Sequence, residues 1–499
     1  MELKTLLAGQ LVPGDSPDSL WVSGLARDSR RVKPGDVFFA IAGAQVDGAG
    51  FAADAVERGA VAVVSDRPLP GLSVPVVAVE DVALALGLAA DRLAGEPSRE
   101  VAVTGVTGTN GKTTTAYLLS WILEAAGQET AMIGTISTRV AGKERASTMT
   151  TPCVLETHAI LAAARAANEK HLVMEVSSHA LDQSRVAGVR FKCAVFTNLT
   201  RDHLDYHGSL ESYGLAKARL FTSLAPDGVA VLNARDSYSK RLARETRGRV
   251  IRYAWSAPGD PAPPAEVEAR IVEETLFGTT LDLHLGQRAK RLIVPQIGRF
   301  NIENVLAAAA AAYALGVSAH AIAAALEANQ GVPGRFERVT PYGVGPAVLV
   351  DYAHTPDALE RVLKTLRPLV KGRLWVVFGC GGERDPGKRG PMGRAVLEQA
   401  DRAILTSDNP RGEDPAQIAA EVVAGSGPQG ARLEIELDRR AAIRFAIRES
   451  SPDDMILIAG KGHELTQRIG SRVIPCDDRE IARAAFFARS AQLGPRHVA

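Results

Sequence analysis

One stretch of the chain, residues 101–126, limits the fold more than any other. Val101–Val106 is short, apolar and rich in β-branched residues, which predicts a buried strand. Apolar residues at helical spacing (119, 122, 123 and 126) predict a helix that ends at Gly127. A polar loop lies between strand and helix: Gly108, Thr109, Asn110, Gly111, Lys112, Thr113 and Thr114. A strand, a glycine-rich loop and a helix in this order predict a phosphate-binding loop.

The residue types in this loop favour a nucleotide. Glycines let backbone N–H groups turn toward an anion, and the N-terminus of a helix adds partial positive charge. Lys112 can reach the terminal phosphates, and the Thr113 hydroxyl can bind Mg²⁺. The strict pattern for such loops requires glycine at the position of Val106, so an ordinary tight turn is the alternative interpretation.

The loop GTNGKTT resembles that of the Mur ligases and of their relatives, the folylpolyglutamate and cyanophycin synthetases. Further motifs follow in the order found in Mur ligases: TTP at 150–152, MEVSSHAL at 174–181, NLTRDHLDYHG at 198–208, GRFNIENVLAA at 298–308, PGRFE at 333–337, DYAHTPDAL at 351–359, GGERDPGKR at 381–389, DNPR at 408–411 and GKGHE at 460–464. These motifs span nearly the whole chain. The resemblance is strongest to the Mur ligases that add meso-diaminopimelate to UDP-MurNAc-L-Ala-D-Glu in peptidoglycan precursor synthesis, using ATP and Mg²⁺.

The resemblance implies that ATP phosphorylates the D-glutamate γ-carboxylate, after which the amine attacks the acyl phosphate. Phosphoryl transfer depends mostly on positioning and electrostatics, for which Lys112 and Mg²⁺ are suited. Glu175 closes an expected strand and His203 follows the next one, where open α/β sheets bind ligands. The resemblance makes both residues metal ligands, whereas their spacing alone fits a solvated acidic loop equally well.

Lys217 lies in an expected helix, SYGLAKARLF, and from the sequence alone it would be an ordinary surface lysine. The resemblance implies that this lysine is carbamylated and has a catalytic role. A lysine with a lowered pKa can be neutral, react with CO₂ and become an anion that helps to hold Mg²⁺. The implied metal ligands are therefore Thr113, Glu175, His203 and the carbamate of Lys217.

Other residues are implied to contact ATP from outside the loop. Asn301 and Asn304 are three apart in an expected helix and share a face. Buried asparagines usually satisfy backbone groups, but the resemblance places this pair at the adenine. The third domain would add Arg335, Asp351 and His354. It would then have to close over ATP, with Gly331 and Gly334 near the hinge.

The resemblance also implies two further binding regions. The UDP-muramoyl substrate would contact Ser29, Ala44, Gln45, Val46, Thr150, Thr151, Ser177, Gln183 and Arg185. From charge alone, the loop around Ser29 would be a solvated basic turn. The amino acid would contact Arg384, Asp408, Asn409, Pro410, Arg411, Gly460 and Glu464. The segment 408–415 also has the composition of a turn before a helix, and the two interpretations are compatible.

Strands that alternate with helices predict an α/β protein, and a length of 499 residues suggests about three domains. We expect a smaller N-terminal α/β domain (1–97), which binds the UDP substrate. A central ATP-binding domain (98–331) would have a mainly parallel sheet covered by helices. A Rossmann-like C-terminal domain (332–499) would bind the amino acid. That last domain lacks G-x-G-x-x-G after its first strand, so we predict no dinucleotide there.

Charge and hydropathy narrow the partners to small molecules. The formal net charge of +1 gives no reason to expect nucleic acid, and no apolar run is long enough to span a membrane. The N-terminus lacks the apolar region of a signal peptide, and the four cysteines have no metal-binding spacing. We therefore expect a cytoplasmic protein with reduced thiols, acting as a monomer.

Three alternatives stay open. A homologue that adds L-lysine would differ in the pocket around Arg411, whose guanidinium suits the additional carboxylate of diaminopimelate. A folylpolyglutamate-type ligase is disfavoured by the long N-terminal domain and by DNPR. A non-catalytic nucleotide-binding module would bind ATP but would release no ADP in response to an amine and a carboxylate.

Overall fold

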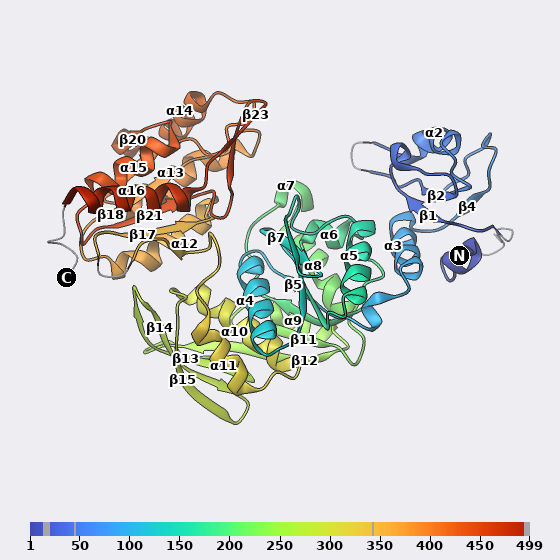
Figure 1. Cartoon of the computed structure of the whole chain (residues 1–499), viewed down its shortest axis with the longest axis horizontal. Helices are drawn as coiled ribbons and strands as arrows, with labels where there is room; N and C mark the ends of the chain where they lie inside the picture. Colours follow the sequence, from blue (N-terminus) through green and yellow to red (C-terminus); the bar gives the residue numbers. More distant parts are fainter. Residues whose placement is uncertain (13–19, 44–45, 342–343, 494–499) are drawn as a thin grey trace.

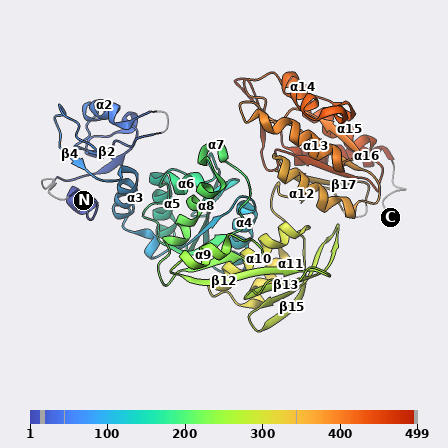
Figure 2. The same cartoon turned by 180° about the vertical axis from the view of Figure 1, so that it is seen from behind.

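A computed structural model describes residues 1–12, 20–43, 46–341 and 344–493. Figure 1 shows three α/β lobes that follow one another along the chain, each with its own sheet. The first and third lobes lie on opposite sides of the central one, as the reverse view in Figure 2 also shows. This architecture confirms the predicted fold class.

The first lobe contains a parallel sheet with the strand order β1-β2-β3-β4. The strands are β1 (Gly24–Ala26), β2 (Asp36–Phe39), β3 (Ala62–Ser65) and β4 (Val76–Ala78), and the helices are α1 (Leu3–Leu6), α2 (Ala52–Glu57) and α3 (Val82–Leu93). Helix α3 faces the central lobe at very short range. A Cβ atom on Gly87 would lie 2.4 Å from the Cβ of Ala187, so glycine permits this close approach.

The central lobe has eleven strands in the order β15-β14-β13-β12-β11-β10-β5-β9-β6-β7-β8. They are β5 (Ala102–Thr107), β6 (Thr130–Ile133), β7 (Ser137–Val140), β8 (Lys143–Ala146), β9 (His171–Glu175), β10 (Phe191–Phe196), β11 (Val229–Asn233), β12 (Arg249–Ser256), β13 (Val267–Thr275), β14 (Gly278–Leu285) and β15 (Arg288–Val294). Across the sheet, the neighbouring strands β13-β12-β11-β10-β5-β9-β6 pair in parallel. The strands beyond β13 and beyond β6 pair antiparallel.

Helices cover both faces of this sheet: α4 (Lys112–Ala125), α5 (Val154–Ala166), α6 (Ser178–Asp182), α7 (Leu204–His207), α8 (Leu210–Thr222), α9 (Ser239–Glu245), α10 (Arg299–Ala314) and α11 (Ala319–Ala328). Alternate strand residues supply the two cores. Val106 and Val195 pack with α4, α10 and α11, whereas Val103 and Phe196 pack on the opposite face with α5 and α8. Successive side chains of a strand point to opposite faces of the sheet, and both faces are covered by helices, as in doubly wound sheets.

The third lobe has the strand order β16-β17-β21-β18-β19-β20, with only β16 antiparallel. These strands are β16 (Glu337–Arg338), β17 (Ala347–Asp351), β18 (Leu374–Phe378), β19 (Arg402–Leu405), β20 (Leu433–Ile435) and β21 (Met455–Ala459). The helices are α12 (Pro356–Leu366), α13 (Arg389–Gln399), α14 (Pro415–Gly425), α15 (Arg439–Glu449) and α16 (Asp478–Leu493). A hairpin of β22 (Thr466–Ile469) and β23 (Arg472–Pro475) follows β21. None of the described helices is long and apolar enough to cross a membrane.

Candidate active site

The predicted phosphate loop joins β5 to α4. Gly108 and Gly111 have φ angles of 150° and 86°, and Gly111 caps the N-terminus of α4. The neighbouring strand end holds the loop, because the backbone N–H of Asn110 donates to Asn198 Oδ1 at 2.9 Å. Lys112 Nζ donates to the carbonyl oxygen of Gly108 at 2.8 Å. The lysine ammonium thus lies over the loop, where it can meet a phosphate.

The asparagines of α10 are buried next to this loop. Asn301 Nδ2 donates to Ile297 O at 2.9 Å, which is the backbone role usual for buried asparagine. Asn304 Oδ1 accepts a hydrogen bond from Thr115 Oγ1 of α4 at 3.4 Å. A Cβ atom on Gly111 would lie only 2.1 Å from Asn304 Oδ1. Asn304 and Gly111 therefore set the distance between α10 and the phosphate loop.

We expect Gly111→Ala to weaken ATP binding and to lower the free energy of unfolding by about 2–4 kcal/mol, since a left-handed alanine and an overpacked contact both destabilise. Gly127→Ala, just beyond the other end of α4, is the control. Gly127 has φ of 77° and no heavy atom within 4 Å of an added Cβ, so this change carries the backbone cost alone. Urea unfolding and ATP titration compare the two variants. If Gly111→Ala and Gly127→Ala have equal stability and equal ATP affinity, Asn304 can move away from the added Cβ at no cost, and the prediction is wrong.

Glu175, at the carboxyl end of β9, is buried and receives three hydrogen bonds. Its carboxylate accepts from Thr135 N at 2.6 Å, from Thr135 Oγ1 at 3.0 Å and from Thr113 Oγ1 at 2.9 Å. Arg335 Nη2, from the start of the third lobe, donates to the same Thr113 hydroxyl at 3.2 Å. A carboxylate beside a hydroxyl at the phosphate loop is an oxygen pair that suits Mg²⁺.

His203 follows β10 and has φ of 51°, with Nε2 3.5 Å from Asp202 Oδ2. Burial lowers the pKa of the imidazole; the charge of Asp202 opposes this shift, and those of Lys112 and Lys217 add to it. The neutral ring that results is the form that binds metals. Across the described residues, no three His, Cys, Asp or Glu side chains gather closely enough to hold an ion alone. Phosphate oxygens and water would have to complete the shell, as is common for Mg²⁺.

The interpretation of Lys217 as a surface lysine is wrong. The residue lies on the inner face of α8 and is 1% exposed. Its Nζ donates to Gly108 O at 2.9 Å, the same oxygen that accepts from Lys112, and lies 4.2 Å from the ring centroid of Tyr213. Burial lowers the pKa of Lys217 well below its usual value, and the charge of Lys112 adds to this effect. This shift favours the neutral amine, which is the form that reacts with CO₂.

The central residues predicted to hold the UDP-muramoyl substrate cluster near the end of β9: Thr150, Thr151, Ser177, Gln183 and Arg185. Arg185 Nη2 donates to Gln183 Oε1 at 2.6 Å, and its Nη1 donates to Thr151 O at 3.2 Å. The backbone N–H of Ser177 donates to Thr151 Oγ1 at 3.1 Å. Arg185 thus contacts Gln183 and Thr151, and Ser177 joins them through Thr151. Thr150 Oγ1 lies 3.0 Å from Thr135 Oγ1, on the side of Glu175.

The first lobe approaches the same guanidinium. Burial lowers the pKa of Arg185, and the charge of Arg27 contributes to the shift. Arg27 was not predicted, because it precedes the basic loop and carries no motif. Two guanidinium groups that repel each other favour an anion between them. Ser29 is buried at the start of a short 3₁₀ helix (Ser29–Arg31), and Val46 is exposed, whereas residues 44 and 45 (Ala44 and Gln45) lie outside the described part of the chain.

The nucleotide contacts predicted in the third lobe surround Tyr352. Arg335 lies 4.3 Å from the Tyr352 ring centroid, and His354 Nδ1 donates to Tyr352 O at 2.9 Å. Asp351 accepts from Phe336 N at 2.7 Å and from its own turn at Ala353 N at 2.8 Å. Asp351 thus fixes the backbone that carries Arg335, while Tyr352 was not predicted.

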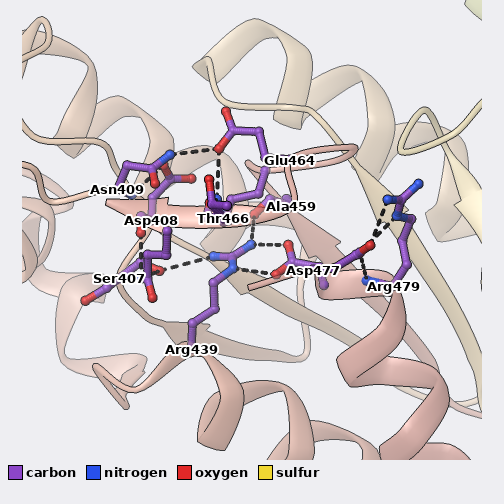
Figure 3. Close-up of polar contacts among 12 residues, drawn as sticks. Ser407, Asp408, Asn409, Arg439, Ala459, Glu464, Thr466, Asp477 and Arg479 are labelled. Atoms are coloured by element: carbon purple, nitrogen blue, oxygen red, sulfur yellow. Dashed lines mark hydrogen bonds and ion pairs between the residues drawn. The ribbon is translucent and has the colours of Figure 1, made fainter. Parts of the chain in front are cut away.

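Two loops at the carboxyl ends of β19 and β21 carry six of the seven residues predicted for the amino-acid pocket (Figure 3). The seventh, Arg384, follows β18. Asn409 Nδ2 donates to Glu464 Oε2 at 2.8 Å, which ties the loops together. The fully buried Lys461 donates to the same oxygen at 2.8 Å, and sequence analysis did not assign this residue a role. A Cβ atom on Gly460 would lie 2.7 Å from Asp408 Oδ2, so the loops also touch there.

Arg411 ends the first of these loops in a left-handed conformation, with φ of 52°. Its Nη1 donates to Gly382 O at 2.6 Å. A Cβ atom on Gly381 would lie 3.1 Å from Arg411 Nη1 and 3.8 Å from Arg384 Cγ, so the two arginines flank this glycine. Arg384 is exposed and Pro410 is buried. The structure thus brings together all seven residues predicted for this pocket.

Family profiles, related sequences and solved structures all match this chain to the same family of proteins. Sequence profiles described as "Mur ligase family, catalytic domain", "Mur ligase middle domain" and "Mur ligase, glutamate ligase domain" match residues 22–93, 106–312 and 334–462. The UDP-N-acetylmuramoyl-L-alanyl-D-glutamate--2,6-diaminopimelate ligase of Synechococcus elongatus is 43% identical over 511 residues, covering 98% of this chain and 99% of the relative. The enzyme of the same name from Solibacter usitatus is 45% identical, covering 93% of each chain. A solved structure of a ligase with this name has 34% identity and a TM-score of 0.72, covering 98% and 99%.

Proposed function

This chain belongs to the Mur ligase family, and we propose that it joins meso-diaminopimelate to the D-glutamate γ-carboxylate of UDP-MurNAc-L-Ala-D-Glu while ATP is converted to ADP. The relatives that carry this activity in their names match almost from end to end. The observation that carries the proposal is the set of three sites on the expected lobes: the phosphate loop, the Arg185 cluster and the pocket between Asp408 and Glu464. The proposed domain boundaries are 97/98 and 331/332.

The central lobe supplies the groups for phosphoryl transfer. Lys112 would move from Gly108 O to the γ-phosphate, while Thr113 and Glu175 would hold Mg²⁺. A γ-carboxylate oxygen of D-glutamate attacks the γ-phosphorus, and ADP leaves with the bridging oxygen. Bound Mg²⁺ would neutralise phosphate charge during this transfer. Lys217, as a carbamate, would offer a second anionic oxygen ligand beside His203.

The second step is amide formation. The amine of diaminopimelate attacks the acyl carbon, inorganic phosphate leaves, and the nitrogen loses a proton. For this step the third lobe must bring the amine to the central lobe. The hydrogen bond from Arg335 to Thr113 already links the two lobes next to Gly331 and Gly334, which have φ of 97° and 64°. We propose these glycines as the hinge.

The pocket would select diaminopimelate through its distal carboxylate, which L-lysine lacks. Arg411 would pair with that carboxylate through a planar guanidinium, and Glu464 would accept a hydrogen bond from the distal ammonium. We expect meso-diaminopimelate to be preferred over L-lysine by about 10⁴ in kcat/KM, because unpaired buried polar groups reject the wrong substrate. Arg411→Ala should lose most of this preference.

The comparison of the two amines tests the assignment of Arg411. Alanine keeps a Cβ at the same left-handed position, so the change removes the guanidinium and not the backbone conformation. Arg472→Ala, at an exposed position on β23, is the matched control and should leave the ratio unchanged. Equal use of L-lysine by the unmutated protein would show that the pocket has been misassigned.

The function as a whole is tested by ADP release. Release should require UDP-MurNAc-L-Ala-D-Glu and meso-diaminopimelate together, with Mg²⁺ present. ATP binding without such dependence would identify a nucleotide-binding module instead. Use of folate-type substrates would identify a different amide ligase. We further propose that the protein acts as a monomer in the cytoplasm.

A further inference from the structure

Arg439 is a buried guanidinium that the proposed reaction does not use. It begins α15 and forms a bidentate ion pair with Asp478, which begins α16, at 2.8 Å (Nε to Oδ1) and 2.6 Å (Nη2 to Oδ2). Both side chains are 0% exposed. Apolar residues of similar volume often replace such a pair without loss of stability, so the fold alone does not explain a charge here.

The other contacts of Arg439 reach the amino-acid pocket (Figure 3). Nη1 donates to Ser407 O at 3.3 Å, and Nη2 donates to Ala459 O at 3.0 Å. Ser407 directly precedes Asp408, the first residue of one pocket loop. Ala459 ends β21 and directly precedes the second loop, residues 460–464. One planar group therefore holds the backbone at the base of both loops.

Neighbouring groups favour this arrangement. Burial works to lower the pKa of Arg439, but Asp478 outweighs it and raises the pKa, with a smaller contribution from Asp408. Gln467 Nε2 adds hydrogen bonds to Ser407 O at 3.4 Å and to Asp408 O at 2.6 Å. The guanidinium is thus permanently charged, and the first loop is held at two successive carbonyls.

We propose that Arg439, oriented by Asp478, is a positioning residue for amino-acid selection. By holding Ser407 and Ala459, it fixes the spacing between the 408–411 and 460–464 loops, and hence between Arg411 and Glu464. This proposal rests on the proposed function of that pocket. A site that must meet a carboxylate and an ammonium at once tolerates little displacement of its loops.

The Arg439→Lys variant keeps the positive charge beside Asp478 but removes the planar group that positions the two loops. A lysine can keep the ion pair with Asp478, but its compact ammonium cannot span both carbonyls as the planar fork does. We expect the KM for meso-diaminopimelate to rise and its kcat/KM ratio over L-lysine to fall, each by about tenfold or more. The KM for ATP should stay within about twofold. A merely structural role would reduce the active fraction, and thus kcat, without moving the ratio.

The control is Arg402→Lys at the opposite end of β19, where Arg402 pairs with Glu434. It should leave both KM and the ratio unchanged. A second variant, Arg439→Met with Asp478→Leu, removes the charges at similar volume and should fold while losing discrimination.

A folded variant with the wild-type ratio and the wild-type KM for meso-diaminopimelate would overturn the proposal. If both Arg439 variants fail to fold, the pair is a folding determinant and the proposal is likewise overturned. A wild-type protein that makes no amide from meso-diaminopimelate would instead refute the proposed function, and that result is obtained without any variant.

Discussion

Lys112→Ala should lower ATP-dependent ligation by about 10³-fold or more, because phosphoryl transfer depends on preorganised charge at the phosphates. The ammonium of Lys112 already lies at the N-terminus of α4, on the carbonyls of Gly108 and Thr109. The change removes no apolar packing from the core around Leu119, so we expect the fold to persist.

The measurement is ADP release at saturating substrates, with circular dichroism as the check on folding. Lys143→Ala, on the exposed strand β8, is the matched control and should be fully active. Substantial ligation by a well-folded Lys112→Ala variant would contradict the role assigned to the loop lysine.

Lys217→Ala should also lose most activity, and a short-chain carboxylic acid in the buffer should restore part of it. Lys217 and Lys112 share one carbonyl oxygen, and burial with the second charge lowers the pKa of Lys217. Reaction with CO₂ would convert the amine to a carbamate and release one proton. The carbamate would place a negative charge beside the Lys112 ammonium, and an opposite-charge pair is favourable in a buried site.

This reaction has a defined pH direction. The neutral amine is the reactive form, and it becomes scarcer as pH falls through the lowered pKa, so activity that depends on the carbamate should fall in the same direction. Depletion of CO₂ should reduce the activity of the wild-type protein and not that of the acid-rescued variant. Lys192→Ala, at an exposed position on β10, is the control. Because a carbamate is labile in mass spectrometry, electron density beyond Nζ in an ATP-bound crystal is the better test. A bare amine there would contradict the proposal.

Sequence patterns predicted those strands, helices and turns that are determined by residues close together in the chain. The β5 strand, the glycine loop and α4 follow from apolar runs and from Gly111 at the helix cap. The shared face of Asn301 and Asn304 follows from helical spacing. The α/β architecture follows from the alternation of such elements.

Long-range contacts could not be predicted in the same way. Lys217 meets Gly108 from 109 positions away, and the periodicity of α8 does not show which strand end its face will meet. Thr135, which donates to Glu175 twice, has no motif of its own. Arg439 lies in α15, a helix with the composition of an ordinary surface helix. Only the tertiary structure shows that Arg439 is buried against Asp478.

The central claim is that ligation passes through an acyl phosphate on the γ-carboxylate of D-glutamate, and isotope transfer tests it most directly. The substrate UDP-MurNAc-L-Ala-D-Glu would carry ¹⁸O in both γ-carboxylate oxygens, and the reaction would be run with ATP, Mg²⁺ and meso-diaminopimelate. One carboxylate oxygen becomes the bridge to phosphorus and leaves with phosphate when the amine attacks. We predict one ¹⁸O atom in each inorganic phosphate and one in the new γ-amide. Unlabelled phosphate, in a reaction that forms ADP and the γ-amide, would contradict the account.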